Sequence, residues 1–316
     1  MSIHRNRLPQ LDADLFLTDG GIETTLIFDD GIDLPDFAAF VLLDSEIGRA
    51  ALHRYFDSYV AVAARDGHGI VLETPTWRAS LDWTSRQGYD VASLVRLNTD
   101  AVTLLEDVRG RHAVPGAAPI VISGCIGPRG DGYQPGELMS WQEARNYHAL
   151  QARVFAEAGA DLVTAITMTY PAEAIGVAEA ARNAGMPVVI SFTTETDGRL
   201  PTGGGLRAAV EEVDAATGGY PAYYMVNCAH PSHFEDVLES GGPWAARIRG
   251  LRANASKASH AELDEAETLD AGDPAELAED YRRLRSRHPQ LTVLGGCCGT
   301  SHRHVGAISA ACALPA

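Results

Sequence analysis

The sequence 294-LGGCCGT-300 places two cysteines, Cys297 and Cys298, side by side between glycines, and a third, Cys228, ends the run 223-YYMVNC. Three thiolates suit zinc, which binds cysteine sulfur in tetrahedral geometry, and three protein ligands leave one position open, as in catalytic zinc sites. Cys228 lies too far upstream for a local zinc-finger spacing. Only the fold can bring the three sulfurs together, and the glycines allow the sharp backbone turn that points both adjacent sulfurs inward.

Other roles for these cysteines stay open. The adjacent pair could fill the core, form a strained vicinal disulfide or act as a redox pair. For Cys125 and Cys312 we expect simple packing, because free cysteine is among the most buried residue types. Four histidines near the cysteines are rival zinc ligands, although such residues more often lie at the surface or at a helix start: His230, His233, His302 and His304.

The bulk composition excludes several classes of protein. The formal charge of −17 over 316 residues opposes binding to nucleic acid or to an anionic membrane. The basic N-terminus has no apolar segment after it, and no uncharged run is long enough to span a bilayer. Five cysteines in a chain of this length are not a disulfide framework. We therefore expect a cytoplasmic protein with reduced thiols, and no feature indicates its oligomeric state.

The elements that must position the cysteines alternate regularly. Eight short β-branched runs, mostly apolar throughout as in buried parallel strands, cover residues 15–20, 69–75, 119–127, 161–167, 187–194, 223–229, 248–254 and 291–297. Segments with helical periodicity lie between them, for example 46–67, 141–159, 172–185 and 274–288. Eight βα units predict an α/β fold, a single-domain (β/α)8 TIM barrel over residues 1–316, with a doubly wound sheet as the alternative.

The barrel prediction has a functional consequence. In this fold, sites form at the C-terminal ends of the strands. The chemically unusual residues occur at such positions: Asp19 after the first run, Glu73 in the second, Asn227 in the sixth, and the three cysteines after the sixth and eighth. Residues distant in sequence are thereby predicted to surround one mouth.

Six motifs run nearly end to end: 18-TDGGIETTL, 123-SGCIGP, 190-ISFTT, 226-VNCAHP, 252-RANAS and 295-GGCCGT. With these motifs the chain resembles the homocysteine S-methyltransferase family. The resemblance implies a (β/α)8 barrel with Zn²⁺ held by Cys228, Cys297 and Cys298. It also implies that Asp19, Gly20 and Gly21 contact the amino-acid end of homocysteine, although Asp19 alone would suit a turn or helix cap.

The chemistry implied by the resemblance is a single displacement. Zinc lowers the pKa of a bound thiol, so the substrate is held as a nucleophilic thiolate. The thiolate attacks a methyl group on a small sulfonium or betaine-type donor and gives methionine, without a protein nucleophile. The expected partners are thus a small-molecule thiol acceptor and a methyl donor. Asn227 either orients this site or satisfies a strand-end backbone group.

One departure from the family pattern concerns the acceptor. After the fourth strand the family usually carries Glu-Thr, whose Glu helps to bind the substrate amine, and here Ile166 occupies that position. Glu73 is the main candidate to supply the missing charge, with Glu23 and Glu195 as weaker ones. The alternatives are a thiol acceptor without the amine, zinc-bound hydroxide performing hydrolysis, which three thiolates disfavour, or a non-enzymatic zinc and thiol redox sensor.

Two further features are ambiguous in the sequence. Trp77 and Trp83 either pack in the core or make cation–π contacts with a cationic methyl donor. The polar, acidic segment 256–273 suits a lid, an interface or a solvated loop, and we expect the solvated loop.

Overall fold

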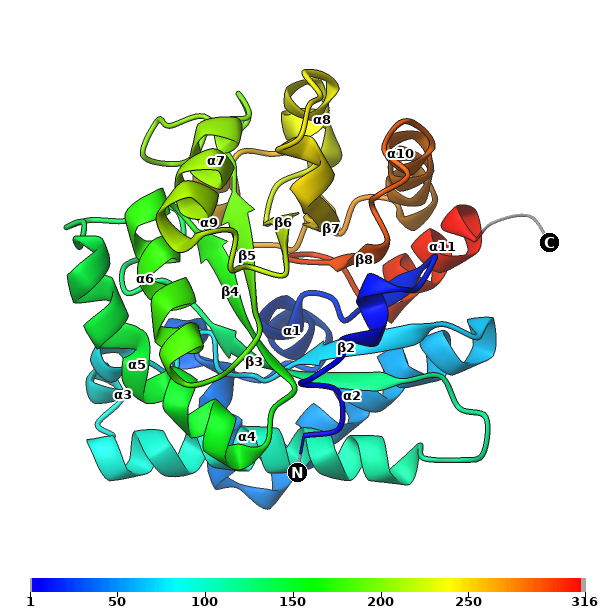
Figure 1. The fold of residues 1–316 in the computed structure, drawn as a ribbon. Helices are drawn as coiled ribbons and strands as arrows, with labels where there is room; N and C mark the ends of the chain where they lie inside the picture. The colour runs from blue at the N-terminus through cyan, green and yellow to red at the C-terminus, as the bar shows by residue number, and fades with distance from the viewer. Residues whose placement is uncertain (1, 314–316) are drawn as a thin grey trace.

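The computed structural model describes residues 2–313 and is a closed barrel of eight parallel strands in sequential order, with β8 paired to β1 (Figure 1). The strands are β1 (Phe16–Thr18), β2 (Gly69–Glu73), β3 (Ile120–Ile126), β4 (Leu162–Met168), β5 (Val188–Thr193), β6 (Tyr223–Asn227), β7 (Ile248–Ala253) and β8 (Val293–Gly296). Seven of them fall within the runs predicted from the sequence, and β4 extends one residue beyond its run, to Met168. The (β/α)8 prediction is confirmed.

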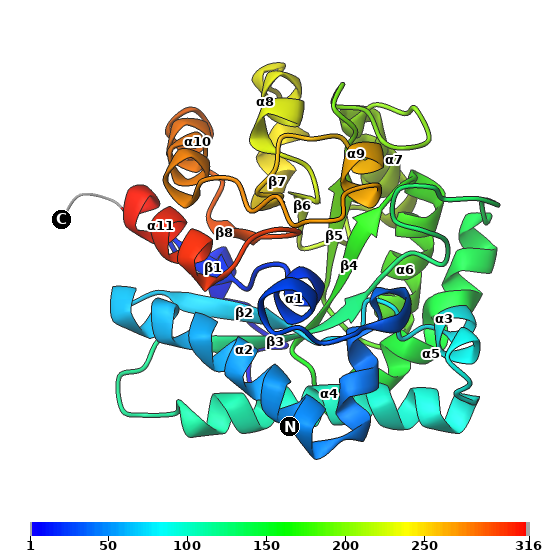
Figure 2. The ribbon, with the colours of Figure 1, turned by 180° about the vertical axis from the view of Figure 1, so that it is seen from behind.

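Helices surround the barrel (Figures 1 and 2). The longer ones are α2 (Glu46–Asp66), α4 (Val91–Arg111), α5 (Trp141–Ala158), α6 (Pro171–Asn183), α7 (Leu206–Thr217), α8 (Pro231–Glu239), α10 (Pro274–Arg287) and α11 (His302–Cys312). Short helices α1 (Ile22–Thr24), α3 (Leu81–Arg86) and α9 (His260–Asp264) lie in the connections. Gly67 and Gly159 end α2 and α5 with left-handed backbone, as their sequence positions predicted.

The hydrophobic core has two layers. The larger layer lies between the strands and the surrounding helices, and includes Phe56, Phe155 and Phe192. The smaller layer fills the barrel interior, where Val121 and Ile166 are buried. Strands buried on both faces explain the continuous apolar runs in the sequence.

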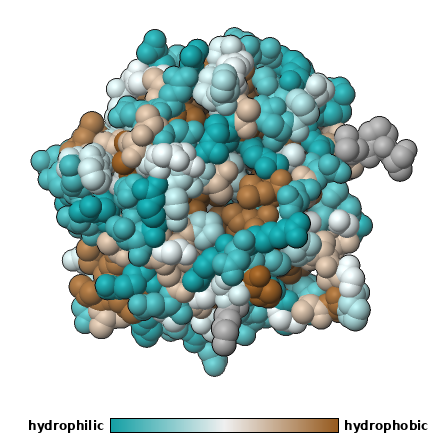
Figure 3. Space-filling view, viewed as in Figure 1, coloured by the Kyte–Doolittle hydropathy of each residue, from teal (hydrophilic) through white to brown (hydrophobic). Residues whose placement is uncertain are grey.

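No helix among residues 2–313 has the length and apolar character needed to cross a membrane. The face seen in Figure 3 is largely hydrophilic, with a hydrophobic area near its centre and smaller ones elsewhere.

Long connections cover the C-terminal mouth of the barrel (Figure 2). They follow β1, β3 and β7, and the last of them contains α9. Segment 256–273, for which we expected a solvated loop, is largely exposed, and it also contributes Ser256, Leu263 and Leu269 to the wall of a cavity at this mouth.

Candidate functional site

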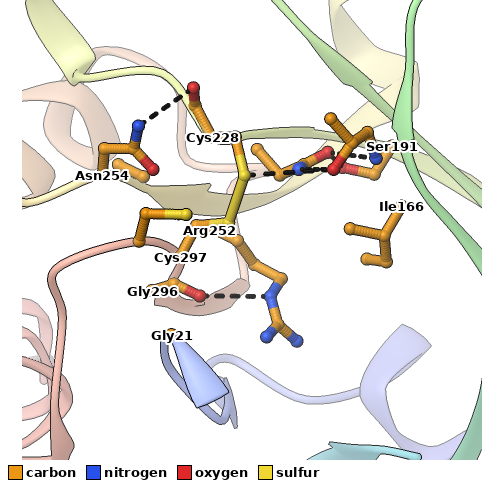
Figure 4. The surroundings of a disulfide bond; sticks show 12 residues. Gly21, Ile166, Ser191, Cys228, Arg252, Asn254, Gly296 and Cys297 are labelled. Carbon is orange, nitrogen blue, oxygen red and sulfur yellow. Dashed lines mark hydrogen bonds between the residues drawn. A yellow bond between two sulfur atoms is a disulfide. The ribbon is translucent and has the colours of Figure 1, made fainter. Parts of the chain in front are cut away.

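The three cysteines predicted to act together lie together. Cys228 follows β6, and Cys297 and Cys298 follow β8. Their Sγ atoms all lie within 4.8 Å of one another. Cys228 and Cys297 are joined by a disulfide (Figure 4). Cys298 has a free thiol. Reduced thiols were expected throughout and a vicinal disulfide was the alternative weighed, but the fold brings Cys228, distant in sequence, against Cys297.

Backbone contacts position Cys228. Its φ angle of 51° lies in the left-handed region, which is unusual for a residue other than glycine. Its N–H donates to the carbonyl of Arg252 at 3.1 Å, and its carbonyl accepts from Asn254 Nδ2 at 3.2 Å. His260 Nε2 lies 2.5 Å from the same carbonyl. Three contacts, one from β7 and two from the connection that follows it, therefore hold this strained turn in place.

The Cys297–Cys298 turn is held in a similar way. The N–H of Cys297 donates to the carbonyl of Ala253 at 2.8 Å, and Thr300 Oγ1 donates to the Cys297 carbonyl at 2.7 Å. A Cβ on Gly21 would lie 2.4 Å from this carbonyl, so only glycine allows the β1 connection to approach so closely. Of the glycines that flank the pair, Gly299 has a φ of 76°, and a Cβ there would lie 2.8 Å from the Asp270 carbonyl, so it too serves a turn and a close backbone approach.

The sulfur cluster fits a metal ion. Zinc–sulfur bonds of ~2.3 Å place the sulfurs of a tetrahedral site ~3.8 Å apart, a separation within reach of these three residues once the disulfide is reduced. Burial raises the pKa of the Cys298 thiol to about 11. The rival histidines have other contacts: His233 Nε2 lies 3.0 Å from the Lys257 carbonyl, and His304 Nε2 lies 2.8 Å from that of Ala271.

A cavity of about 510 Å³ opens beside the cysteines at the barrel mouth. The predicted site residues on its wall are Asp19, Gly20, Gly21, Glu73, Cys228, Cys297 and Cys298. Cys125, expected to be a packing residue, is buried but also reaches this wall, whereas Cys312 is buried in the outer core layer.

Asn227 does not line the cavity. Its Oδ1 accepts from the N–H of Thr167 at 2.9 Å and from Ser191 Oγ at 2.6 Å, and its Nδ2 donates to Thr167 Oγ1 at 2.8 Å. Thr167 has a φ of 65°, so this amide stabilises a strained turn at the end of β4. Of the two roles weighed for Asn227, satisfying strand-end groups is the one the contacts support.

The inner end of the cavity holds three buried charged side chains. Asp19 Oδ1 lies 2.7 Å from Arg252 Nη1, and both residues are buried. Burial raises the pKa of Asp19, and the Arg252 guanidinium acts in the opposite direction. Burial also raises the pKa of Glu73 to about 7, again opposed by Arg252. Glu23, nearer to Cys298, has its pKa raised to about 7 for the same reason.

The two tryptophans have a cation of the protein itself against their rings. The Arg78 guanidinium carbon lies 4.2 Å from the ring centroid of Trp77 and 3.6 Å from that of Trp83. Arg78 also pairs with Asp131 at 3.0 Å. These aromatic faces thus serve to hold Arg78 at the cavity wall.

Sequence reasoning missed three residues around the cysteines. Arg252 lines the cavity from the end of β7, Tyr133 has its hydroxyl 3.8 Å from Cys298 Sγ, and His260 stacks on Tyr133 with 3.9 Å between ring centroids. For Arg252 a signal existed, because a charged residue near the end of a buried strand is unusual. Tyr133 and His260 lie in long connections, where no periodicity indicates position.

A closed (β/α)8 barrel with three cysteine sulfurs close together at its C-terminal mouth is an arrangement that could hold a metal ion in an enzyme site. The sequence pattern described as homocysteine S-methyltransferase matches residues 16–312. The chain therefore belongs to the homocysteine S-methyltransferase family and is a methyltransferase acting on a thiol. Among curated proteins, none matches the chain.

Solved structures give the same fold. The chain is similar to the homocysteine methyltransferase MmuM from Escherichia coli in its oxidised form, with a TM-score of 0.78 and 20% identity over 98% of this chain and 99% of that one. The metallated form gives a TM-score of 0.77 and 21% identity, with coverages of 97% and 99%. The apo form gives 0.68 and 20%, with coverages of 95% and 96%.

Proposed function

We propose that this protein transfers a methyl group from a small sulfonium or betaine-type donor to the thiolate of homocysteine, giving methionine, with zinc as its metal. The observation that carries the proposal is the convergence of Cys228, Cys297 and Cys298 on one wall of the mouth cavity. Zinc held by these residues would lower the pKa of the acceptor thiol, so that the sulfur is a thiolate near neutral pH. Zinc is favoured because thiolate sulfur is a soft ligand.

The chain's own residues bind and orient the acceptor. Asp19, Gly20 and Gly21 lie on the cavity wall next to the cysteines, where they can contact the amino-acid end of the acceptor. Asn227 acts indirectly, by holding the Thr167 turn of the same wall. Because the thiolate is the nucleophile, the protein contributes mainly alignment of donor and acceptor.

The charge of the cavity favours a cationic donor. Two arginines, Arg78 and Arg252, face an excess of carboxyl groups along the wall: Asp19, Glu23, Asp33, Glu73, Asp131, Asp264 and Asp270. Such a wall attracts a sulfonium or quaternary ammonium ion and disfavours an anionic one. Apolar residues on the same wall, among them Ile27 and Leu263, would help to exclude water from the reacting atoms.

The alternative function is a thiol redox sensor, favoured by the disulfide between Cys228 and Cys297. Zinc release on oxidation would then alter partner binding, and no donor would support turnover.

The experiment is metal analysis of the reduced protein, followed by turnover with homocysteine and each of S-methylmethionine, S-adenosylmethionine and glycine betaine. We expect one zinc per chain and methionine formation with one donor. Zinc binding without turnover for any donor would contradict the proposal and favour the sensor.

A further inference from the structure

Two buried side chains of opposite charge face the mouth cavity without pairing with each other. Glu73, at the end of β2, is 5% exposed, and Arg252, near the end of β7, is 6% exposed. Both line the cavity. Among residues 2–313, the ion pairs of Arg252 comprise the one to Asp19, and none joins it to Glu73. Burying charges in this way is costly unless a partner compensates them.

Glu73 carries the clearest sign of a missing partner. Its Oε2 is buried and has no hydrogen-bond partner among the residues that the structure describes. A buried acceptor left unsatisfied costs free energy, and a donor on a bound ligand would remove that cost. The charge of Arg252 and the hydroxyls of Ser123 and Thr164, which bond each other at 2.7 Å, favour the ionised form of Glu73. Among residues 2–313, however, no cation forms an ion pair with this carboxylate. The apolar Ile166 lines the same cavity.

Arg252 is fixed next to the cysteines. Its Nε donates to the carbonyl of Gly296, the residue before Cys297, at 3.2 Å (Figure 4). Its Nη2 donates to the carbonyl of Gly20 at 3.3 Å, and its Nη1 lies against Asp19. A guanidinium has five N–H donors, so donors remain for an incoming carboxylate. Arg252 thereby ties the position of such a carboxylate to that of the sulfur cluster.

We propose that Glu73 and Arg252 form a subsite for the zwitterionic end of an α-amino acid thiol, with the ammonium on Glu73 and the carboxylate on Arg252. This inference rests on the proposed function, because it concerns the acceptor of the methyl group. An α-amino acid carries both charges on one carbon, a few bonds from its thiol. Two opposite charges that share a cavity without touching, beside the thiol-binding cysteines, complement that arrangement. The burial that raises the pKa of Glu73 to about 7 would be offset by an ammonium partner.

The test is calorimetric titration of the reduced, zinc-loaded protein with L-homocysteine and with 4-mercaptobutanoate, which has the same thiol and carboxylate but no amine. We expect homocysteine to bind on the order of 10- to 100-fold more tightly, as for a buried charge-assisted contact. In Glu73→Gln this preference should disappear while the affinity for 4-mercaptobutanoate is retained. The matched control is Glu23→Gln, which removes a different carboxyl from the same wall and should keep the preference.

The outcomes separate the two proposals. Equal binding of both thiols to the unchanged protein would overturn the zwitterion subsite and leave thiol methylation intact. Binding of neither thiol to zinc-loaded protein would overturn the proposed function itself. A preference that survives in Glu73→Gln and is lost in Glu23→Gln would also overturn the assignment, because it places the ammonium on Glu23.

Arg252 is tested separately with Arg252→Lys and a mercaptan without a carboxylate, 3-mercaptopropylamine. The lysine variant should weaken homocysteine binding about tenfold and leave binding of the amine unchanged. An equal loss for both ligands would mean that Arg252 only positions the cysteine turn, and it would contradict the carboxylate role.

Discussion

The two inner walls of the cavity are built differently. The sulfur wall (Cys228, Cys297 and Cys298) is held chiefly by backbone hydrogen bonds and tight turns. The charged wall (Asp19, Glu73 and Arg252) consists of side chains that interact with one another across strands. Backbone geometry tolerates changes in neighbouring side chains, whereas a charge pattern changes with one substitution. Thiol activation is therefore expected to be the constant part of this site, and acceptor recognition the adaptable part.

The largest expected effect comes from the sulfur wall. Cys228→Ser, Cys297→Ser or Cys298→Ser should each lose zinc and reduce turnover by on the order of 1,000-fold or more, because the metal contributes several kcal/mol to activating the thiol. Metal analysis and methionine formation measure the two losses. Cys312→Ala, a buried cysteine outside the cluster, is the control and should keep both. Full zinc content in any of the three serine variants would remove that residue from the metal site.

The charged wall should be visible in the pH dependence of stability. Since the pKa of Glu73 is raised from 4.5 to about 7, the folded protein binds this proton more tightly than the unfolded chain does. Ionised Glu73 therefore destabilises the fold above pH 7, and this cost falls as the pH decreases toward 4.5. Urea unfolding should show that Glu73→Gln gains ~2–3 kcal/mol of relative stability at pH 8 compared with pH 5.

The control for this measurement is Glu137→Gln, an exposed carboxyl, which should change stability equally at both pH values. A pH-independent effect of Glu73→Gln would contradict the raised pKa. It would mean that a partner such as Arg252 compensates the negative charge of Glu73 in the folded protein.

A carboxylate at another position of the cavity wall should be able to replace that of Glu73 in binding the acceptor amine. Ile166 lines the same cavity from β4, so Ile166→Glu can supply a carboxylate from a neighbouring direction. In the Glu73→Gln background it should restore about tenfold preference for homocysteine over 4-mercaptobutanoate, measured by titration. Ile166→Gln in the same background is the uncharged control. If both variants recover the preference for homocysteine, a polar side chain rather than a negative charge is sufficient to bind the amine.

The smallest effect is expected at the edge of the sulfur wall. Tyr133→Phe removes the hydroxyl that lies 3.8 Å from Cys298 Sγ while keeping the ring stacked on His260. Zinc affinity, measured by chelator competition, should fall by about tenfold, as for other residues that contact metal ligands. The control is Tyr220→Phe, which removes a hydroxyl that donates to the carbonyl of Met186, and it should leave the zinc affinity unchanged. An unchanged affinity would mean that Tyr133 acts only through packing.

Much of this molecule could be predicted from the sequence. The eight strands appear in the sequence as continuous apolar runs, because they are buried on both faces. The main helices appear as amphipathic segments, because they are buried on one face. The type of residue at the strand ends, together with barrel topology, predicted that the cysteines, Asp19 and Glu73 would share one mouth. Segment 256–273 is largely exposed, as expected of a solvated loop, but its contribution to the cavity wall was not predicted because its apolar residues, Leu263 and Leu269, are too few to form a pattern.

By itself the sequence determined the barrel and the three cysteines that meet at its C-terminal mouth, since these follow from local periodicity and from residue identity. Only the tertiary structure decided which of the polar and charged side chains pair with each other. Asp19 pairs with Arg252, Asn227 turns its amide toward Thr167, and Glu73 is left with an unpartnered oxygen. Such pairings depend on distances of a few ångströms between strands that are far apart in the chain, and no pattern along the sequence records them.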